Sequence, residues 1–273
     1  MKIYIMTDLE GVAGVLDFEN WCTPESRYYE TAKELLTLEV NAAVEGFIEG
    51  GATEIIVADG HGYGGLDPSL LSPRAMLMRG WPEGYPLGLD TSFEAIAWIG
   101  QHAKAGTEYA HLAHTASFHM LDYAINGVSI GEFGQVALCA AELGVRPVFG
   151  SGDLAFTKEA EALFPGIETV VVKHGTTPGK GDTCTAEEYG SRNCAAIHFP
   201  PERAREMIHE GAREAMNKAR HAGHVQVDLQ PPYEVAAKYR ADATRPVREA
   251  TFRHPSSISE LINLSHGIKP PKP

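Results

Sequence analysis

Residues 1–14 read MKIYIMTDLEGVAG, and they decide the fold. The apolar run around Ile3 and Ile5 predicts a buried strand, which ends in two carboxylates, Asp8 and Glu10. Side chains two residues apart in an extended chain point the same way, so both carboxylates leave the strand end together. Two like charges so placed repel each other. The stretch therefore predicts either a cation between Asp8 and Glu10 or an acidic pair that reaches water freely.

A helix and a second strand follow this opening strand. Residues 28–50 carry apolar residues at helical spacing and stop at Gly50-Gly51, and residues 54–59 read as a buried strand. A strand, helix and strand of these lengths form a βαβ unit with parallel strands. Further strands are predicted at 94–100, 146–150 and 168–173, with a short strand within 74–79 and helices near 132–144 and 157–163. We therefore expect an α/β fold, an open and mostly parallel sheet with helices on both faces.

The organisation changes from about residue 199. Pro200-Pro201 opens an amphipathic helix, residues 225–229 alternate like a half-exposed strand, and Ser256-Ser257 caps a short helix. We predict an α/β domain over residues 1–198 and a smaller α+β C-terminal lobe over residues 199–273.

Composition restricts the partners. A net charge of −13 argues against nucleic acid or an anionic membrane as the main partner, because both bind through Lys/Arg patches. No apolar window approaches the roughly 20 residues that span a bilayer. The cysteines show no C-x-x-C spacing, which predicts a cytoplasmic protein with reduced thiols and no cysteine metal site.

Three predicted strands end in carboxylate or histidine. Asp8 and Glu10 follow the first, Asp59 and His61 the second, and His102 the strand at 94–100. Each signal alone is weak, since a strand-end Asp is commonly a cap and a lone His is commonly a satisfied packing group. Ligands of open parallel sheets bind at the carboxyl ends of the strands, so we expect these residues to converge. Imidazole and carboxylate without thiolate suit Zn²⁺, Mn²⁺ or Co²⁺.

The strand-end residues divide into expected ligands and support. Asp8 is the natural bridge between two ions, which in such pairs lie about 3.5–4 Å apart. Asp59 is expected to orient His61 rather than to bind an ion. Spacing does not choose among the histidines of the next segment, His111, His114 and His119.

Five segments occur in a fixed order along the chain: DLEGVAG at 8–14, DGH at 59–61, GQHAKA at 100–105, AHT at 113–115 and IGEFG at 130–134. Together they resemble the M55 metallopeptidase family, typified by the D-aminopeptidase of the bacterial dipeptide-transport operon. The similarity covers nearly the whole chain and is weaker in its second half.

The resemblance implies a dinuclear zinc site whose ligands are Asp8 as the bridge, Glu10, His61, His102 and Glu132. The residues alone had not singled out Glu132, which reads as an acid at a helix start. The resemblance also selects His114 as the catalytic histidine over His111 and His119. The spacing from His102 to His114 is one residue longer than is usual in the family, so His111 stays a second candidate.

The implied activity is hydrolysis of the N-terminal residue of short peptides, including D-amino-acid peptides, by a water that two metal ions activate. The family description makes the histidine a nucleophile, whereas we favour His114 as an acid/base. The resemblance further implies two zinc ions per subunit, with Mn²⁺ or Co²⁺ as alternatives, and a homo-oligomeric ring that is a decamer in the type member.

Alternatives from other classes remain open at this point. A broader aminopeptidase, an amidase or another metal-dependent amidohydrolase would use the same ligands. A phosphoesterase would also need cations near the site, for which Lys104 and Lys173 are the evident candidates. A non-enzymatic metal- or ligand-binding subunit of a larger assembly is the third reading.

Overall fold

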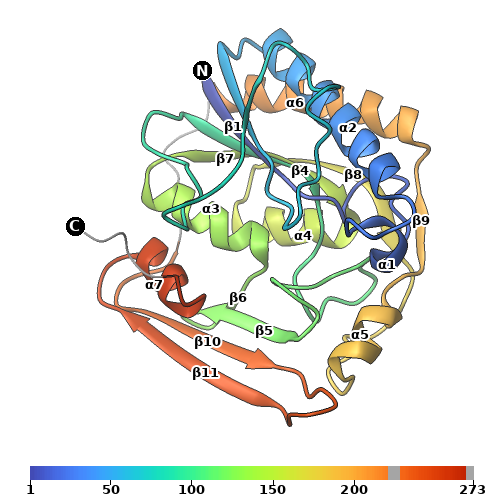
Figure 1. Cartoon of the computed structure of the whole chain (residues 1–273). Helices are drawn as coiled ribbons and strands as arrows, with labels where there is room; N and C mark the ends of the chain where they lie inside the picture. Colours follow the sequence, from blue (N-terminus) through green and yellow to red (C-terminus); the bar gives the residue numbers. More distant parts are fainter. Residues whose placement is uncertain (221–227, 269–273) are drawn as a thin grey trace.

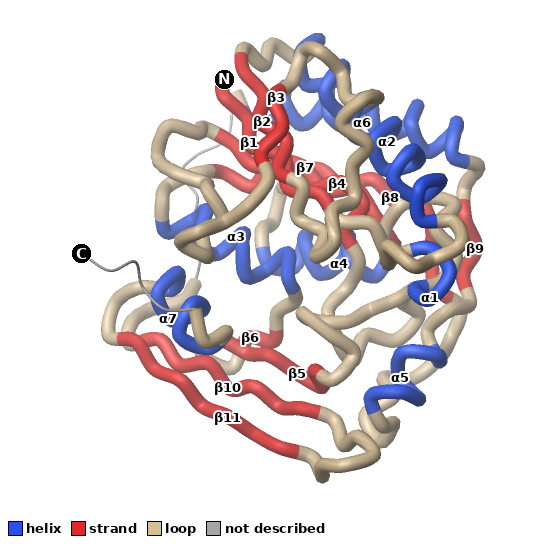
Figure 2. Tube along the Cα trace, in the orientation of Figure 1, coloured by secondary structure: helices blue, strands red, loops and turns tan. Residues whose placement is uncertain are grey.

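The computed structural model describes residues 1–220 and 228–268, and its main feature is a seven-stranded sheet (Figures 1 and 2). The strands are β1 (Lys2–Thr7), β2 (Glu54–Ala58), β3 (Met76–Met78), β4 (Ala95–Gln101), β7 (Arg146–Asp153), β8 (Glu168–Gly175) and β9 (Ala196–His198). They lie in the order β3-β2-β1-β4-β7-β8-β9, and only β9 runs antiparallel to its neighbour. The predicted open, mostly parallel sheet is confirmed.

Helices cover both faces of this sheet. On one face α2 (Tyr29–Glu49) and α6 (Pro201–Ala219) lie side by side, and on the other lie α3 (Glu132–Glu142) and α4 (Leu154–Leu163) (Figure 1). Successive side chains of a strand point to opposite faces, so Ile3 and Ile5 pack in the core under α2 and α6. Tyr4 and Met6 belong to the other core. Strand β1 is therefore buried on both sides, as parallel strands usually are.

A smaller antiparallel sheet lies beyond α3 (Figures 1 and 2). Its order is β11-β10-β5-β6, and its strands are β5 (Met120–Ile125), β6 (Val128–Ser129), β10 (Tyr233–Tyr239) and β11 (Arg248–His254). Helix α7 (Ile258–Ser265) packs on α3, β10 and β11. The small sheet thus combines segments from before and after residue 199, while α6 packs on the large sheet. The division at residues 198/199 stays a prediction.

Two shorter helices, α1 (Phe18–Trp21) and α5 (Ala186–Arg192), complete the secondary structure of the described ranges. The strand predicted at 225–229 falls mainly on residues 221–227, which lie outside the described residues, and positions 228–229 are not in a strand. None of the helices in the described part of the chain has the length and hydropathy of a bilayer-spanning segment.

The carboxyl ends of β1 and β4 approach each other closely, and this approach positions the site. Beyond the paired strands, the amide of Asp8 donates to the carbonyl of Ile99 (2.9 Å) and that of Gly11 to the carbonyl of Gly100 (2.7 Å). A Cβ at Gly11 would lie 2.1 Å from the carbonyl oxygen of Gln101, so a side chain would push the strand ends apart. The residues that follow β1 and β4 are therefore held side by side.

Candidate metal centre

The structure brings all five predicted ligands together at the carboxyl edge of the large sheet. Asp8 and Glu10 follow β1, His61 follows β2, His102 follows β4, and Glu132 is the first residue of α3. Together with His114 they form two groups of three residues, and within each group the candidate ligand atoms all lie within 4.8 Å of one another. One group is Asp8, Glu10 and His61, and the other is His102, His114 and Glu132.

The Asp8 carboxylate faces both groups. Its Oδ1 lies 3.3 Å from Nδ1 of His61, and its Oδ2 lies 3.2 Å from Nε2 of His102. The backbone amide of Leu9 donates to Oδ1 (2.9 Å), and the side-chain amide of Gln101 donates to Oδ2 (3.0 Å). These two donors hold the carboxylate in its position between the two groups.

Backbone carbonyls orient both imidazoles. Nε2–H of His61 donates to the carbonyl of Cys22 (2.8 Å), which leaves Nδ1 facing the carboxylates. Nδ1–H of His102 donates to the carbonyl of Ala103 (2.9 Å), which leaves Nε2 facing them. Each ring thus turns its other nitrogen toward the carboxylates, and this is the nitrogen that would bind a metal ion after losing its proton.

The prediction that Asp59 orients His61 is wrong. Oδ1 of Asp59 accepts a hydrogen bond from the backbone amide of Gly65 (2.7 Å), and its carboxylate lies 3.8 Å from the Arg79 guanidinium. Asp59 therefore shapes the loop after β2, while the Cys22 carbonyl orients the ring.

The charges of the cluster favour a cation. Burial opposes a charged imidazole, yet the carboxylates of Glu10 and Asp8 raise the pKa of His61 to about 12. Burial also opposes the charge on His102, but the Asp8 carboxylate, 3.2 Å from its Nε2, and the charge of Glu132 raise its pKa to about 10. Among the described residues, Glu10 Oε2 and His102 Nε2 are buried without a hydrogen-bond partner. Zinc binds nitrogen and oxygen atoms of these kinds, so the two unpaired atoms suit it as ligands.

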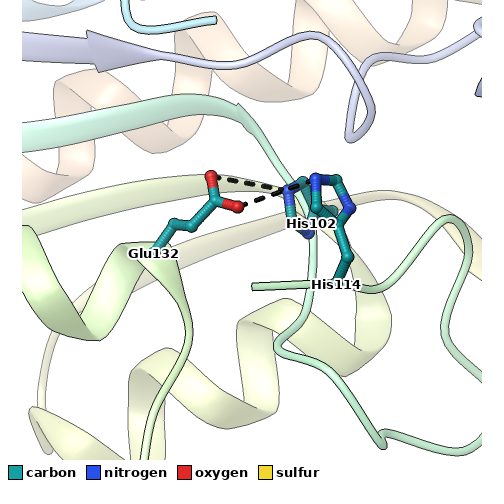
Figure 3. A group of neighbouring side chains, drawn as sticks. All are labelled: His102, His114 and Glu132. Atoms are coloured by element: carbon teal, nitrogen blue, oxygen red, sulfur yellow. Dashed lines mark ion pairs between the residues drawn. The ribbon is translucent and has the colours of Figure 1, made fainter. Parts of the chain in front are cut away.

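His114 lies beside the second group (Figure 3). Its ring stacks on that of His102 with the centroids 4.0 Å apart and the planes at 14°. Nδ1–H of His114 donates to the carbonyl of Leu112 (2.8 Å), so Nε2 is the atom that faces Glu132 Oε1, at 3.6 Å. The same Oε1 accepts from the amide of Ala116 (2.7 Å). His114 Nε2 is thus placed either to bind an ion or to exchange a proton with a substrate.

A pocket of about 920 Å³ opens over these groups. Phe18 and Phe118 line it and pack around the His114 ring, with centroids 6.4 Å and 4.9 Å from that ring. Tyr85 and His266, stacked at 5.6 Å, line it as well. In the part of the chain that the structure describes, no lysine or arginine lines this pocket.

The other histidines of the segment have different surroundings. Nε2–H of His111 donates to the carbonyl of Leu16 (3.0 Å), and its side chain is buried outside the pocket lining. His119 lines the pocket rim, where its Nε2 lies 3.9 Å from Asp242. Of the three histidines that spacing left open, His114 is the one in contact with the candidate ligands.

Buried His111 makes stability depend on pH. Burial, with the nearby charge of Lys173, lowers the pKa of His111 from 6.5 to about 2. Below pH 6.5 the unfolded chain binds a proton here that the folded chain does not, so acid favours unfolding. Between pH 7 and pH 5 the protein should lose about 2 kcal/mol more unfolding free energy than His111→Gln, whose amide keeps a donor for Leu16. Urea unfolding at both pH values measures this, and equal losses would contradict it.

The fold and the site define an α/β protein whose strand ends gather imidazoles and carboxylates, the kinds of side chain that bind metal ions. The chain belongs to the M55 peptidase family, because the family model described as D-aminopeptidase matches residues 1–251. The resemblance seen in the five sequence segments is confirmed.

Two matches come from Bacillus subtilis, one by sequence and one by structure. The D-aminopeptidase of strain 168 is 32% identical over 176 residues, which are 63% of this chain and 64% of the relative. The match therefore spans less than two thirds of that relative. The solved structure of the Zn-dependent D-aminopeptidase DppA, described as a self-compartmentalizing protease, superposes with a TM-score of 0.80 at 21% identity. It covers 98% of this chain and 97% of DppA, which shows that the fold is shared.

Proposed function

We propose that this protein is a zinc-dependent aminopeptidase that removes the N-terminal residue of short peptides, with D-aminoacyl peptides as substrates. The observation that carries the proposal is the Asp8 carboxylate, which faces His61 on one side and His102 on the other. Membership of the M55 family and the names of the two Bacillus proteins support the reaction type.

The proposed ligand set divides between two zinc ions per chain, with Mn²⁺ or Co²⁺ as alternatives. Glu10 and His61 would hold one ion, His102 and Glu132 the other, and Asp8 would bridge them. Such a pair activates water and polarises a carbonyl when it is bound.

The remaining residues of the pocket position the peptide and move the proton. The aromatic rings of Phe18 and Phe118 pack around His114, and a peptide bond bound above the two groups would lie within reach of its Nε2. His114 Nε2 would hydrogen-bond the developing oxyanion or protonate the leaving amine. Its bond to the Leu112 carbonyl keeps the ring in the required tautomer.

His114→Gln separates the roles of this histidine. If it acts as an acid/base, kcat should fall about 10²- to 10⁴-fold while two zinc ions stay bound, because the five ligands are intact. The expected result is this fall in kcat with an unchanged zinc content. Plasma mass spectrometry measures the zinc content. Loss of one zinc would make His114 a ligand instead, and a nearly full kcat would remove it from the chemistry. His209→Gln is the matched control and should keep most of the activity, because His209 pairs with Glu49 and does not line the pocket.

A substrate panel tests the function itself. The protein loaded with zinc should release the amine from D-aminoacyl p-nitroanilides and short D-peptides, and chelation should abolish this release. Equal turnover of L-substrates would indicate a broader aminopeptidase or amidase. Zinc binding without amide turnover but with phosphate release would indicate a phosphoesterase.

The structure gives the phosphoesterase little support. Lys173 is buried, and Lys104 lines a different pocket and donates to the carbonyl of Ser129. Neither candidate cation lines the pocket over the metal groups. Protein that binds no metal and turns over neither substrate would favour the non-enzymatic subunit.

We further propose a homo-oligomeric ring, a decamer as in the family's type member. The description of DppA as self-compartmentalizing supports an assembly that encloses its sites. Light scattering in solution gives the mass that tests this. A cytoplasmic location stays part of the proposal. The four cysteines are free, which agrees with the expectation of reduced thiols.

A further inference from the structure

Glu159, on the α4 helix, connects the two segments that carry His102 and Glu132. Its Oε2 accepts a hydrogen bond from the backbone amide of Lys104 (2.8 Å), and its Oε1 accepts one from the amide of Gly131 (2.9 Å). Lys104 lies two residues after His102, and Gly131 directly precedes Glu132. A single carboxylate thus fixes the backbone next to both of these predicted ligands.

The two segments are packed too tightly to adjust independently. A Cβ at Gly131 would lie 2.8 Å from Cβ of Lys104 and 3.0 Å from Glu159 Oε1. The Lys104 ammonium also donates to the Ser129 carbonyl (2.9 Å), which ties the same segments a second time. Gly131 is the residue before α3 and offers no side chain of its own to hold the start of the helix. The position of Glu132 therefore depends on a group from another helix.

Glu159 is absent from the pocket lining and from both candidate ligand groups. Nor does it bond to the segments that carry the other predicted ligands, Glu10 and His61, in any hydrogen bond of the described residues. Glu159 therefore contacts only the segments that carry His102 and Glu132. A shift of either segment would change the distance between these two side chains.

We propose that Glu159 is a positioning residue for one of the two metal ions, the one held by His102 and Glu132. The inference rests on the proposed dinuclear site. A supporting carboxylate of this kind typically changes metal affinity about 10- to 100-fold. The ion held by Glu10 and His61 should be insensitive to Glu159.

Glu159→Gln is the test variant, because it keeps the shape but turns an amide NH₂ toward one of the two backbone N–H groups. Zinc titration against a chromophoric chelator should give two ions per chain in the unmodified protein. In the variant, one ion should bind as before and the other about 10- to 100-fold more weakly. Glu161→Gln is the matched control, since Glu161 is an exposed carboxylate on the same helix that accepts a hydrogen bond from the Thr169 hydroxyl. It should leave both affinities unchanged.

Two backgrounds assign the affected ion. In His61→Ala the ligands His102 and Glu132 are intact, and there Glu159→Gln should weaken the binding of the remaining zinc ion. In His102→Ala it should have no effect. Equal weakening of both ions would make Glu159 a general structural residue, and unchanged affinities would refute the inference while the dinuclear proposal stands. Unmodified protein that binds no zinc would refute the proposed function. Should Glu159→Gln not fold, Glu159→Asp, which keeps the charge but reaches only one amide, replaces it in the same titration.

Discussion

Asp8→Asn should lower kcat/KM for a D-aminoacyl substrate at least about a thousand-fold, a loss of several kcal/mol in transition-state stabilisation. Bound zinc should fall from two ions per chain to one or none. Asparagine keeps the size of the side chain and an oxygen for the Leu9 amide, but it removes the charge. With that oxygen in the Oδ1 position, the new NH₂ group takes the place of Oδ2, which lies 3.2 Å from Nε2 of His102. Steady-state kinetics and plasma mass spectrometry on the same sample measure both effects.

Asp90→Asn is the control for this substitution. Asp90 is an exposed aspartate whose Oδ1 accepts from the backbone amide of Ser92 (2.7 Å), and an asparagine oxygen can do the same. Activity and zinc content should stay at the level of the unmodified protein. If Asp8→Asn also retained two ions and full turnover, Asp8 would not bridge them, and the division of ligands proposed here would be wrong.

The residues of the site differ in how clearly the sequence predicts them. Asp8, Glu10, His61 and His102 were predicted because each follows a strand of a parallel sheet, and this topology fixes where strand ends meet. Glu132 starts a helix, where an acid is common for reasons of the helix dipole, so only the family resemblance identified it.

The supporting contacts could not be predicted from residue types. His61 is oriented by the carbonyl of Cys22, 39 residues away, and Glu159 acts on two backbone amides. Every residue except proline has an amide and every residue has a carbonyl, so such partners leave no pattern in a sequence. Gln101 is the one of these supporting residues that its place in the sequence indicates, because it directly precedes His102. Its side-chain amide donates to Asp8.

The strands of the small sheet were also not predicted from the sequence. Its pairing of β5 with β10 joins residues 120–125 to residues 233–239, and neither strand has the continuous apolar run that marks the parallel strands. In β11, half-buried residues alternate with exposed ones over the sequence REATFRH, in which only Ala250 and Phe252 are apolar. An edge strand that packs on one face carries too few apolar residues for periodicity to identify it.

Lys173 shows how burial changes the meaning of a charged residue. From the sequence it was a candidate cation for a phosphate, but the structure buries it completely. Its ammonium donates to the carbonyls of Glu10 (2.5 Å), Val12 (3.0 Å) and Val15 (3.3 Å). An ammonium has three N–H donors, and here each has a carbonyl of the loop after β1. Lys173 therefore holds the loop that carries Glu10.

Lys173→Met should lower the free energy of unfolding by about 3 kcal/mol, because methionine fills much of the same space but removes the ammonium donor from three buried carbonyls. Of these, only the Val12 carbonyl keeps another donor among the described residues, the Val15 amide at 3.3 Å. The Glu10 loop should loosen as well, so zinc affinity should fall in the half-site of Glu10 and His61 and stay unchanged in the other. Urea unfolding of the metal-free protein separates the first effect from the second. Lys218→Met is the control, since that lysine is exposed and pairs with Glu168 at the surface, where a change of no more than about 0.5 kcal/mol is expected. If both lysines cost the same, the three carbonyl contacts contribute no more to stability than a surface ion pair, and the loop must be held by its own packing.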